Sequence, residues 1–343
     1  MVLRTAAGLR ARGVDVRVLT TGDRGIREYE GVRTERLPVS RYAFNLQVRR
    51  IATAAREAEI IHTFTYNACM PSYVAARWIG RPIICEVLAL FGRVWRKMRG
   101  PFAGQAIQAW ERFLISRPYE RTLFPSERCR VAGLALGARA ERSLVVPPGI
   151  DHNRFEPAER KSRYVLFAGH FDHRKGLQHV IAAARALPDI PFRAVGWSDD
   201  PLDLNTSVPP NLHITEARGG PPYWDALRGA PIFFFPSHAE TFGIGLAEAM
   251  ACGLPVVAVA SGAVPELVTA EVGELVPRSR PDEFAQAINA LFERDQEALR
   301  RAARAKATGH LSWDAAFRGL LGHYAHLKQR PLLEPAKPVV FDG

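Results

Sequence analysis

Cysteines are few in this sequence, and long hydrophobic runs are absent. The four cysteines, Cys69, Cys85, Cys129 and Cys252, are scattered and form no C-x-x-C pair. Structural disulfides and zinc sites need closer or repeated spacing, so we expect reduced thiols in a cytoplasmic protein. No apolar run approaches the roughly 18 residues that a membrane-spanning helix requires. The composition therefore argues against a disulfide-rich domain and an integral membrane protein.

Lysine is also scarce, because 40 of the 46 basic residues are arginine. With 35 acidic residues, the formal net charge is +11. Two explanations account for this excess equally well. One is a coding sequence rich in G and C, whose codons favour arginine, and the other is an anionic partner. Nucleic acid is the weakest anionic candidate, since the basic residues are interspersed with acids and no zinc-finger or RNP motif occurs. We therefore expect a nucleotide or a phospholipid surface, and no nucleic acid.

What the sequence does contain is an alternation of helices and short apolar strands, in a composition typical of globular proteins. In the first half, hydrophobic periodicity predicts helices over residues 2–12 and 70–78 and strands over 14–19, 60–62, 82–87, 122–124 and 144–146. The second half contains predicted strands over 164–168, 192–195, 231–235, 256–260 and 273–276 and helices over 177–186, 281–292 and 297–308. Such alternation is typical of parallel sheets covered by helices on both faces.

The break at Pro147-Pro148-Gly149 divides the chain into two predicted α/β domains, each doubly wound and Rossmann-like. We place the first domain at residues 1–147 and the second at 148–310. Such sheets bind ligands outside the carboxyl ends of their strands, so two of them face to face enclose a cleft. Residues 330–343 hold three of the 25 prolines, and we expect a loosely ordered tail there.

The most informative stretch is HAETFGIGLAEAMACGLPVV, residues 238–257. The first N–H groups of a helix lack internal partners and attract anions, so a diphosphate fits at this helix start. The backbone groups concerned are those of Gly243, Ile244, Gly245 and Leu246. Glu248 can accept hydrogen bonds from a ribose diol, and we expect Glu240 to face open space and hold sugar hydroxyls. Alternatively, Glu240 is a solvated loop residue and Glu248 pairs with an arginine, but their spacing around the glycine turn favours the ligand site.

A second candidate phosphate-binding element is AGHFDHRKGL, residues 168–177. A predicted strand ends here, and Lys175 precedes the next helix, where it can neutralise a leaving phosphate together with Arg174. His170 and His173 have the spacing of a metal pair, but no third ligand at a suitable distance is evident. We therefore expect no metal site.

Several segments of the second half match a known family. They are VVPPGIDHNRF (145–155), FAGHFDHRKGL (167–177), PSHAETFGIGLAEAMACGLPVVA (236–258) and SGAVPELV (261–268). In this order and spacing they resemble the nucleotide-sugar-binding domain of family 4 glycosyltransferases, which are retaining enzymes of the GT-B architecture. LSWDAAFRGLLGHY (311–324) is similar to the closing helix of that fold, which we place at 311–329 and expect to return towards the first domain.

The resemblance implies transfer of a sugar from a nucleotide-diphosphate donor to a hydroxyl acceptor, with retention of configuration. UDP is the expected carrier, no cofactor or metal is needed, and the acceptor is a lipid-linked saccharide, a polysaccharide precursor or a small molecule. Glu240 then contacts the donor sugar, Glu248 binds the ribose and Lys175 holds the diphosphate. The family has an arginine where His170 stands, and a neutral imidazole stabilises a leaving phosphate less than a guanidinium does. Arg174 can compensate for this change.

The first half resembles the family less well. PIICEVLALFG (82–92) is similar to a segment that often carries a His or Arg near the reacting sugar, and Leu88 stands nearest to that position. His62 matches a family position near a strand end, although a lone histidine there is more often structural. These departures leave open a non-catalytic nucleotide-sugar-binding relative, while the intact site residues of the second half favour an enzyme.

The segment RVWRKMRGPFAGQAIQAWERFLISR, residues 93–117, interleaves four aromatic residues with cations. This pattern suits peripheral contact with an anionic membrane, at its inner face, where a lipid-linked acceptor would be found. The alternative is a helical face packed on its own domain, and the pattern alone favours this alternative slightly.

The resemblance also predicts an element upstream of Met1, because family members begin with a strand and a glycine-rich loop. That strand is central in a doubly wound sheet, and its neighbours would otherwise lose hydrogen bonds and core contacts. We expect the genomic DNA upstream of Met1 to encode, in frame, an apolar strand and a glycine-rich turn. Sequencing checks this, and a stop codon immediately upstream together with a stable, active recombinant protein would contradict it.

Overall fold

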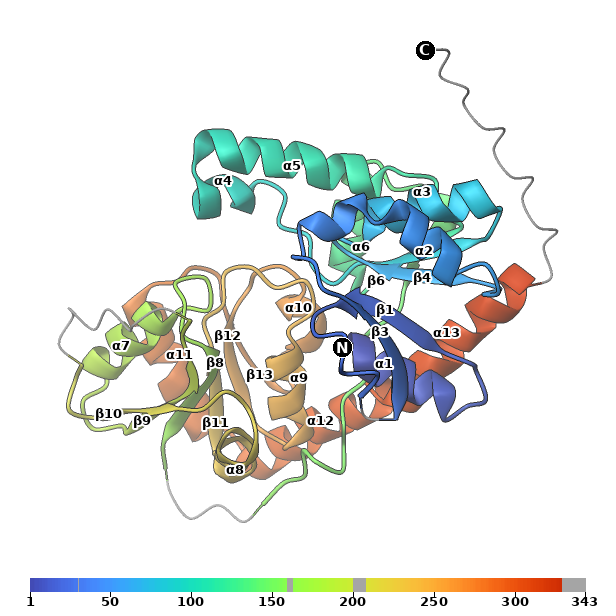
Figure 1. The fold of residues 1–343 in the computed structure, drawn as a ribbon. Coiled ribbons are helices and arrows are strands. Elements are labelled where there is room, and N and C mark those ends of the chain that lie inside the picture. Colours follow the sequence, from blue (N-terminus) through green and yellow to red (C-terminus); the bar gives the residue numbers. More distant parts are fainter. Residues whose placement is uncertain (30, 159–162, 200–207, 329–343) are drawn as a thin grey trace. The chain divides into compact units, whose positions relative to one another are not determined.

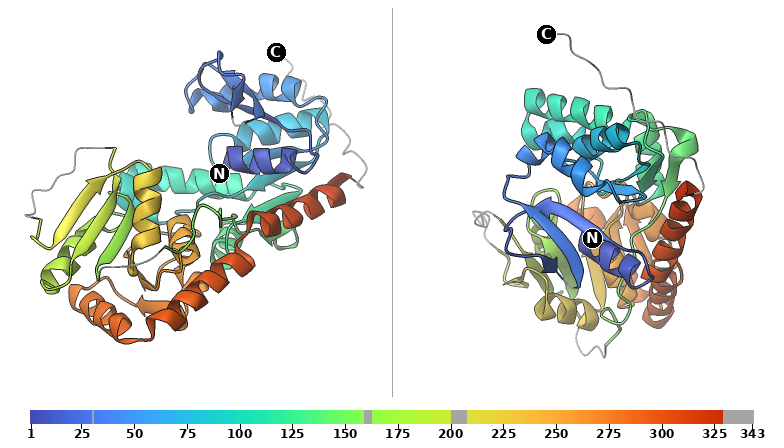
Figure 2. Two further views of the ribbon diagram at one scale, coloured as in Figure 1. Left: turned by 90° about the horizontal axis from the view of Figure 1, so that it is seen from below. Right: turned by 45° about the vertical axis from the view of Figure 1, so that its right-hand side comes forward.

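The computed structural model describes residues 1–29, 31–158, 163–199 and 208–328, so the predicted tail 330–343 lies outside the described residues. The chain forms two compact units, one of residues Met1–Pro147 and Asp314–Gly343 and one of residues Pro148–Trp313. We call them unit 1 and unit 2. In each unit, helices surround sheets built mainly of parallel strands (Figures 1 and 2). This confirms the predicted α/β fold class.

Unit 2 contains a six-stranded, entirely parallel sheet in the order β10-β9-β8-β11-β12-β13. The strands are β8 (Val165–His170), β9 (Phe192–Trp197), β10 (Leu212–Glu216), β11 (Ile232–Phe235), β12 (Val256–Val259) and β13 (Gly273–Val276). Numbered from β8, the order is 3-2-1-4-5-6, which reverses between β8 and β11. Ligands of such sheets bind at this reversal, outside the carboxyl ends of the strands. The loops after β8 and β11 are therefore placed to form a site.

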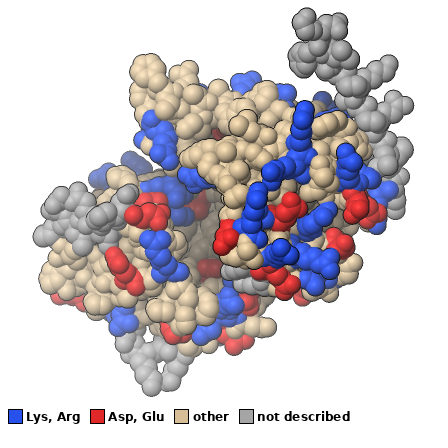
Figure 3. Space-filling view, viewed as in Figure 1, with Lys and Arg blue, Asp and Glu red and all other residues tan. Residues whose placement is uncertain are grey.

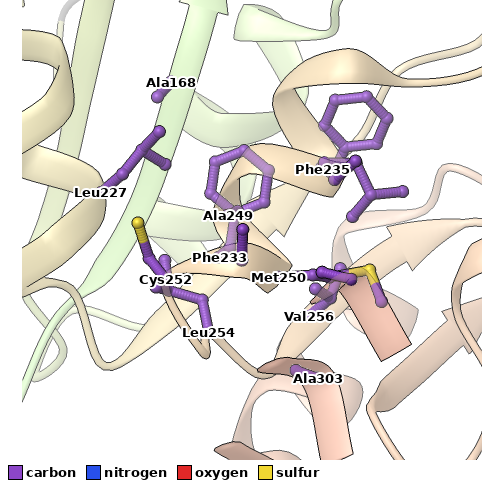
Figure 4. Close-up of a cluster of buried hydrophobic side chains, with 14 of the residues drawn as sticks. Ala168, Leu227, Phe233, Phe235, Ala249, Met250, Cys252, Leu254, Val256 and Ala303 are labelled. Carbon is purple, nitrogen blue, oxygen red and sulfur yellow. The ribbon is translucent and has the colours of Figure 1, made fainter. Parts of the chain in front are cut away.

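Helices cover both faces of this sheet because its central strands are apolar on both sides. The helices are α7 (Leu177–Ala186), α8 (Pro221–Gly229), α9 (Ile244–Ala251), α10 (Val264–Leu267), α11 (Pro281–Glu293) and α12 (Gln296–His310). In β11, Phe233 and Phe235 belong to one hydrophobic cluster, and Ile232 and Phe234 to the cluster on the opposite face. Figure 4 shows the first cluster, in which Phe233 and Phe235 lie among side chains of α8, α9 and α12. All four residues are at most 4% exposed, which fixes the register of the strand that leads into the site.

The strands of unit 1 form two sheets rather than the single sheet that the sequence predicted. One has the order β1-β3-β2, with β1 parallel and β2 antiparallel to β3, and the other is the parallel sheet β4-β5-β6-β7. The strands are β1 (Arg17–Thr21), β2 (Glu28–Tyr29), β3 (Val32–Leu37), β4 (Ile61–Phe64), β5 (Ile83–Glu86), β6 (Arg121–Phe124) and β7 (Ser143–Val145). Within the described part of unit 1, no ladder joins β1 to β4, so each of these strands is paired along one edge.

Strand β1 begins three residues later than predicted, and the reason lies in the preceding helix. Gly13 has a φ of +82°, and the N–H groups of Gly13 and Val14 bond back to carbonyls of α1. These bonds close the carboxyl end of the helix, so residues 13 and 14 cannot enter a ladder. Strands β2, β3 and β10 were not predicted from the sequence. In β3, the buried residues Val32 and Thr34 alternate with charged residues. The segment is so highly charged that its hydrophobic periodicity did not indicate a strand.

The helices of unit 1 come from both ends of the chain. They are α1 (Val2–Arg10), α2 (Val48–Ala54), α3 (Cys69–Ile79), α4 (Val94–Arg99), α5 (Pro101–Ile115), α6 (Glu127–Ala135) and α13 (Trp313–Lys328), with short 3₁₀ turns at Ala43–Leu46 and Ala140–Arg142. Helix α13 packs on α1, where Gly8 leaves room for the Phe317 ring and Arg12 pairs with Asp314. His62 Nδ1 lies 2.7 Å from the hydroxyl of Tyr324, so this histidine also joins α13 to the sheet.

A buried carboxylate organises the loop that follows β5. Glu111 of α5 is 0% exposed, and its two oxygens accept hydrogen bonds from the backbone N–H groups of Phe91 (2.9 Å) and Gly92 (2.7 Å). The Tyr66 hydroxyl (2.7 Å) and Trp95 Nε1 (3.1 Å) complete the set of donors. Burial of a carboxylate is favourable only when it is hydrogen-bonded in this way. Glu111 therefore ties the loops after β4 and β5 to helix α5.

Replacement of this carboxylate should destabilise unit 1. In Glu111→Ala at least one buried donor loses its acceptor, which costs about 1–3 kcal/mol and more where a charged partner is removed. Denaturant unfolding followed by tryptophan fluorescence measures the loss. Arg112→Ala, an exposed neighbour on the same helix, is the control and should change stability by less than about 0.5 kcal/mol. Equal unfolding midpoints for the two variants would show that Glu111 does not hold the loop.

Candidate active site

The loops after β8 and β11 meet through Lys175 and Glu240. The Lys175 ammonium forms an ion pair with Glu240 Oε1, and Ser237 Oγ donates a hydrogen bond to the same oxygen at 2.7 Å. The Glu240 side chain is 8% exposed and that of Lys175 23%. The expectation that Glu240 faces open space, and the alternative of a solvated loop residue, are therefore wrong. The loop turns the carboxylate inwards, where a cation and a hydroxyl compensate its lost hydration.

Two glycines allow the loops to approach this closely. Gly262, after β12, has a φ of +52°, and a Cβ there would lie 2.0 Å from the carbonyl oxygen of Glu240. The next residue, Ala263, donates its N–H to that carbonyl at 3.0 Å. Gly176 has a φ of +89°, and a Cβ there would lie 2.5 Å from the carbonyl oxygen of Pro236. A side chain at Gly176 would force the loops after β8 and β11 apart, and one at Gly262 would push the loop after β12 away from the loop after β11.

Asp172, which the sequence analysis did not single out, orders the turn that carries Lys175. Its carboxylate accepts the backbone N–H of Lys175 at 2.6 Å and the guanidinium of Arg174 at 3.2 Å, and it lies 3.1 Å from His170 Nδ1. Burial raises the pKa of Asp172, but the Lys175 N–H, Arg174 and His170 outweigh it and bring the pKa below its usual value. Asp172 is therefore an anion that holds the surrounding cations at the end of β8.

His170 lies between two carboxylates. Its Nδ1 is 3.1 Å from Asp172 and its Nε2 is 3.2 Å from Asp199, which in turn pairs with Arg218. A neutral imidazole can donate to one of these carboxylates, and a second ring proton is needed to donate to both. The ring also meets Trp197 edge-on, with centroids 5.4 Å apart. The residue at the position of the family's arginine is thus held by acidic neighbours at the carboxyl end of the sheet.

The predicted diphosphate-binding backbone lies at the start of α9. Gly243 has a φ of +94° and precedes the helix, and no side chain caps the helix start. The carbonyl of Gly243 accepts the N–H of Ala247 at 3.0 Å, so the intervening N–H groups of residues 244–246 precede the first helical bond. Ile244 is 41% exposed. The first residue of the helix is therefore exposed, whereas Gly243 and Leu246 are buried.

Glu248, in the second turn of α9, interacts with a residue that the sequence analysis missed. The hydroxyl of Tyr223 in α8 donates to Glu248 Oε2 at 3.0 Å. Burial and the Glu248 carboxylate raise the pKa of Tyr223, so the phenol keeps the proton that it donates. A Cβ on Gly245 would lie 3.3 Å from the same hydroxyl oxygen. Tyr223 thus fixes the orientation of Glu248 beside the helix start, and no sequence spacing indicates this pair.

His170 and His173, the two histidines with the spacing of a metal pair, contact other side chains: His170 lies between Asp172 and Asp199. His173 lies beside Gln178, with its Nδ1 3.3 Å from Gln178 Nε2. His179 Nε2 lies 2.6 Å from His238 Nε2, and burial with its two histidine neighbours lowers the pKa of His179 to about 4. Among the residues that the structure describes, no group of three His, Cys, Asp or Glu side chains is arranged to hold a metal ion.

Leu88 belongs to unit 1. Its backbone N–H donates to Thr65 Oγ1 at 3.0 Å, which joins the loop after β5 to the loop after β4. The position where the family often has a His or Arg is therefore occupied by an aliphatic side chain whose backbone helps to order the loop. His62, on β4 in the same unit, contacts Tyr324 of α13.

Comparison with solved structures identifies the fold as GT-B, the fold of a large class of glycosyltransferases. Sucrose-phosphate synthase from Thermosynechococcus elongatus superposes with a TM-score of 0.80 at 20% identity, over 95% of this chain and 92% of that one. The Anabaena HepE structure in complex with UDP gives a TM-score of 0.77 at 21% identity, over 94% and 95% of the two chains.

Residues 150–308 match the family described as glycosyl transferases group 1, and residues 1–149 match the glycosyl transferase 4-like domain. The chain therefore belongs to the group 1, family 4-like glycosyltransferases and is a retaining glycosyltransferase. Two of its relatives are D-inositol 3-phosphate glycosyltransferases. That of Mycobacteroides abscessus is 27% identical over 94% of this chain and 83% of its own length. That of Xylanimonas cellulosilytica is 28% identical over 96% and 92%. The family and the enzyme class predicted from the sequence are thus confirmed.

Proposed function

We propose that this enzyme transfers a sugar from a nucleoside diphosphate sugar to the hydroxyl of an acceptor, and that unit 2 binds the donor. The observation that carries the proposal is the ion pair of Lys175 with the inward-facing Glu240 at the reversal point of the sheet. A buried carboxylate and a cation beside an uncapped helix start can stabilise both charges that form when a glycosyl phosphate bond breaks.

The diphosphate is assigned to Lys175 and the start of α9. The backbone of Gly243, Ile244, Gly245 and Leu246 offers N–H groups, and Lys175 supplies a full positive charge. Arg174 and His170 border the same turn and share Asp172 as a partner. As the bond from the anomeric carbon to the phosphate oxygen breaks, negative charge grows on the diphosphate. Lys175 is placed to stabilise this charge, with Arg174 as a further cation and His170 as a hydrogen-bond donor.

The transferred sugar is assigned to Glu240 and the ribose to Glu248. The sugar ring gains positive charge as the leaving diphosphate departs, and a carboxylate held in a low-dielectric site stabilises that charge. Glu248 keeps one oxygen on Tyr223 and has further acceptor capacity for a vicinal diol. The donor therefore extends from Glu240, past the helix start, to Glu248.

The proposal also includes UDP as the nucleotide of the donor and a hydroxyl compound as the acceptor. Structures of Anabaena HepE contain UDP and UDP-glucose, at 19–21% identity to this chain, which supports UDP as the carrier. The relatives named for D-inositol 3-phosphate support an acceptor that presents a ring or chain hydroxyl. The proposal requires no cofactor or metal.

Replacement of Glu248 and replacement of Glu240 should change different kinetic constants. Glu248→Ala removes contacts to the unreacting ribose, so it should raise KM for the nucleotide sugar about ten- to hundredfold, equivalent to ~1.5–3 kcal/mol. Glu240→Gln removes an interaction that strengthens in the transition state, so it should lower kcat. Its affinity for free nucleoside diphosphate should stay nearly unchanged. Steady-state kinetics and calorimetric titration of UDP measure these effects.

Glu271→Gln provides the control, because Glu271 is an exposed carboxylate of unit 2 outside the site. It should leave kcat, KM and UDP affinity at the wild-type values. Lys175→Ala should lower both turnover and diphosphate affinity, since its partner is present in donor and product alike. Wild-type turnover in Glu240→Gln would show that the catalytic assignment is wrong.

Exposed apolar side chains in the segment 93–117 support a second proposed property of the protein, which is peripheral contact with a membrane. Helices α4 and α5 lie side by side as a hairpin on unit 1 (Figure 1). Phe102 is 88% exposed, and Met98 and Trp110 are 42% and 41% exposed. Trp95 instead bonds to Glu111 inside the unit, so the packed-face alternative accounts for this aromatic residue. No helix of the described residues is both long and apolar enough to cross a bilayer. We propose that this hairpin rests on the inner face of an anionic membrane.

Vesicle binding tests the membrane contact. The protein should sediment with anionic vesicles at low salt and less at high salt, because the attraction is screened over about 8 Å at physiological ionic strength. Phe102→Ser should weaken sedimentation, because it removes an exposed apolar anchor. Val131→Ser is the control, since Val131 is 55% exposed on α6, outside the hairpin. Equal sedimentation with neutral and anionic vesicles would refute the contact.

A further inference from the structure

Unit 1 contains a cavity lined mainly by arginines. Its volume is about 780 Å³, within the range of small-molecule sites. Five of the nine lining residues are arginines, namely Arg24, Arg27, Arg33, Arg36 and Arg50, and the others are Glu28, Thr34, Glu35 and Leu37. Several of these residues follow β1 or lie in β3, and Arg50 comes from α2. Figure 3 shows basic side chains crowded over the part of unit 1 where Figure 1 draws β1 and β3.

The cavity lies where a parallel pair of strands binds ligands. Strands β1 and β3 are parallel, with Thr21 opposite Leu37 at their carboxyl ends. Gly22 donates its N–H to the carbonyl of Leu37 at 2.9 Å, so the chain leaves β1 beside the end of β3. The loop that carries Arg24 and Arg27 therefore starts at the carboxyl edge of the small sheet, which is the edge that binds ligands in α/β proteins.

The arginines are held in place by the fold of this loop. The buried Thr34 donates its N–H to the carbonyl of Arg27 at 2.8 Å and its hydroxyl to the carbonyl of Ile26 at 3.0 Å. Gly25 donates its N–H to Asp23 Oδ1 at 2.8 Å, which closes the turn that precedes Arg27. These bonds fold residues 22–27 back along β3, so that arginines separated in sequence converge on one cavity.

The charges of the lining are not balanced within it. Five guanidinium groups face two carboxylates, those of Glu28 and Glu35. In the described part of the chain, none of the five arginines forms an ion pair. Arg36 Nε is buried and has no hydrogen-bond partner among the described residues. A buried donor without an acceptor costs free energy that a bound anion would recover.

We propose that this cavity binds a phosphate ester. Guanidinium groups match phosphate oxygens in a bidentate geometry, and several of them are needed to hold a dianion in a site open to water. The volume exceeds that of phosphate and accommodates a phosphorylated sugar or polyol. The proposal rests on the geometry of unit 1 alone.

Binding is tested with inorganic phosphate and sorbitol 6-phosphate in the presence of saturating UDP, so that the phosphate-binding groups of unit 2 are already occupied. Arg50→Ala and the double variant Arg33→Ala/Arg36→Ala should bind sorbitol 6-phosphate about tenfold more weakly or worse, the effect of one charge-assisted hydrogen bond. Arg49→Ala is the matched control, because Arg49 is the exposed neighbour of Arg50 on α2 and does not line the cavity. All variants should keep wild-type UDP affinity and thermal stability, and Arg50→Lys should restore part of the binding.

Vesicles containing phosphatidic acid distinguish a lipid phosphate from a soluble ester. Binding of sorbitol 6-phosphate that Arg50→Ala weakens assigns the cavity to a soluble phosphate ester. Binding to vesicles alone, weakened in the same variant, assigns it to a lipid phosphate. Absence of both, or equal loss in Arg49→Ala and Arg50→Ala, overturns the site. If the phosphate ester binds but Glu240→Gln transfers sugar normally, the cavity stands and the catalytic assignment fails.

Discussion

The pairing of the Lys175 ammonium with the buried Glu240 carboxylate is the interaction on which the proposed donor site depends. A carboxylate that is 8% exposed has lost most of its hydration, and it is tolerated only when a cation and hydrogen-bond donors replace the lost water. This requirement brings the loops after β8 and β11 together. It also explains the glycines at 176 and 262, because a side chain at either position would collide with a backbone carbonyl of the neighbouring loop. The charges that we propose for catalysis are thus also those that join the two loops.

Unit 1 also contains a buried glutamate whose hydrogen bonds hold loops together. Glu111, fully buried, gathers four donors from the loops after β4 and β5 and from the start of α4. In both units a glutamate is buried at the carboxyl end of a parallel sheet, where loops would otherwise be free to move. In unit 2 the buried carboxylate faces a cation. In unit 1 it faces neutral N–H and O–H groups, so its role there is to order the chain.

The distribution of arginine links composition to structure. An excess of arginine by itself is compatible with codon usage. Its placement differs from one part of the chain to another. Arg174 is bound by Asp172 in the donor site, whereas the arginines of the cavity beside β3 converge with few carboxylates among them. Whether an arginine is neutralised by a carboxylate depends on neighbours that are distant in the sequence.

The sequence by itself determined the alternation of helices and strands, the helix start at residues 243–246 and the family. These properties are local, because periodicity and turn residues report which faces are buried over a few residues. Tertiary structure alone decided that Glu240 turns inwards to Lys175, that Asp172 and Tyr223 orient the site, and that Glu111 orders a loop. It also decided how the strands of unit 1 divide into two sheets. These contacts join segments separated by up to 65 residues, and their free energy depends on burial and on partner charges that no local pattern contains.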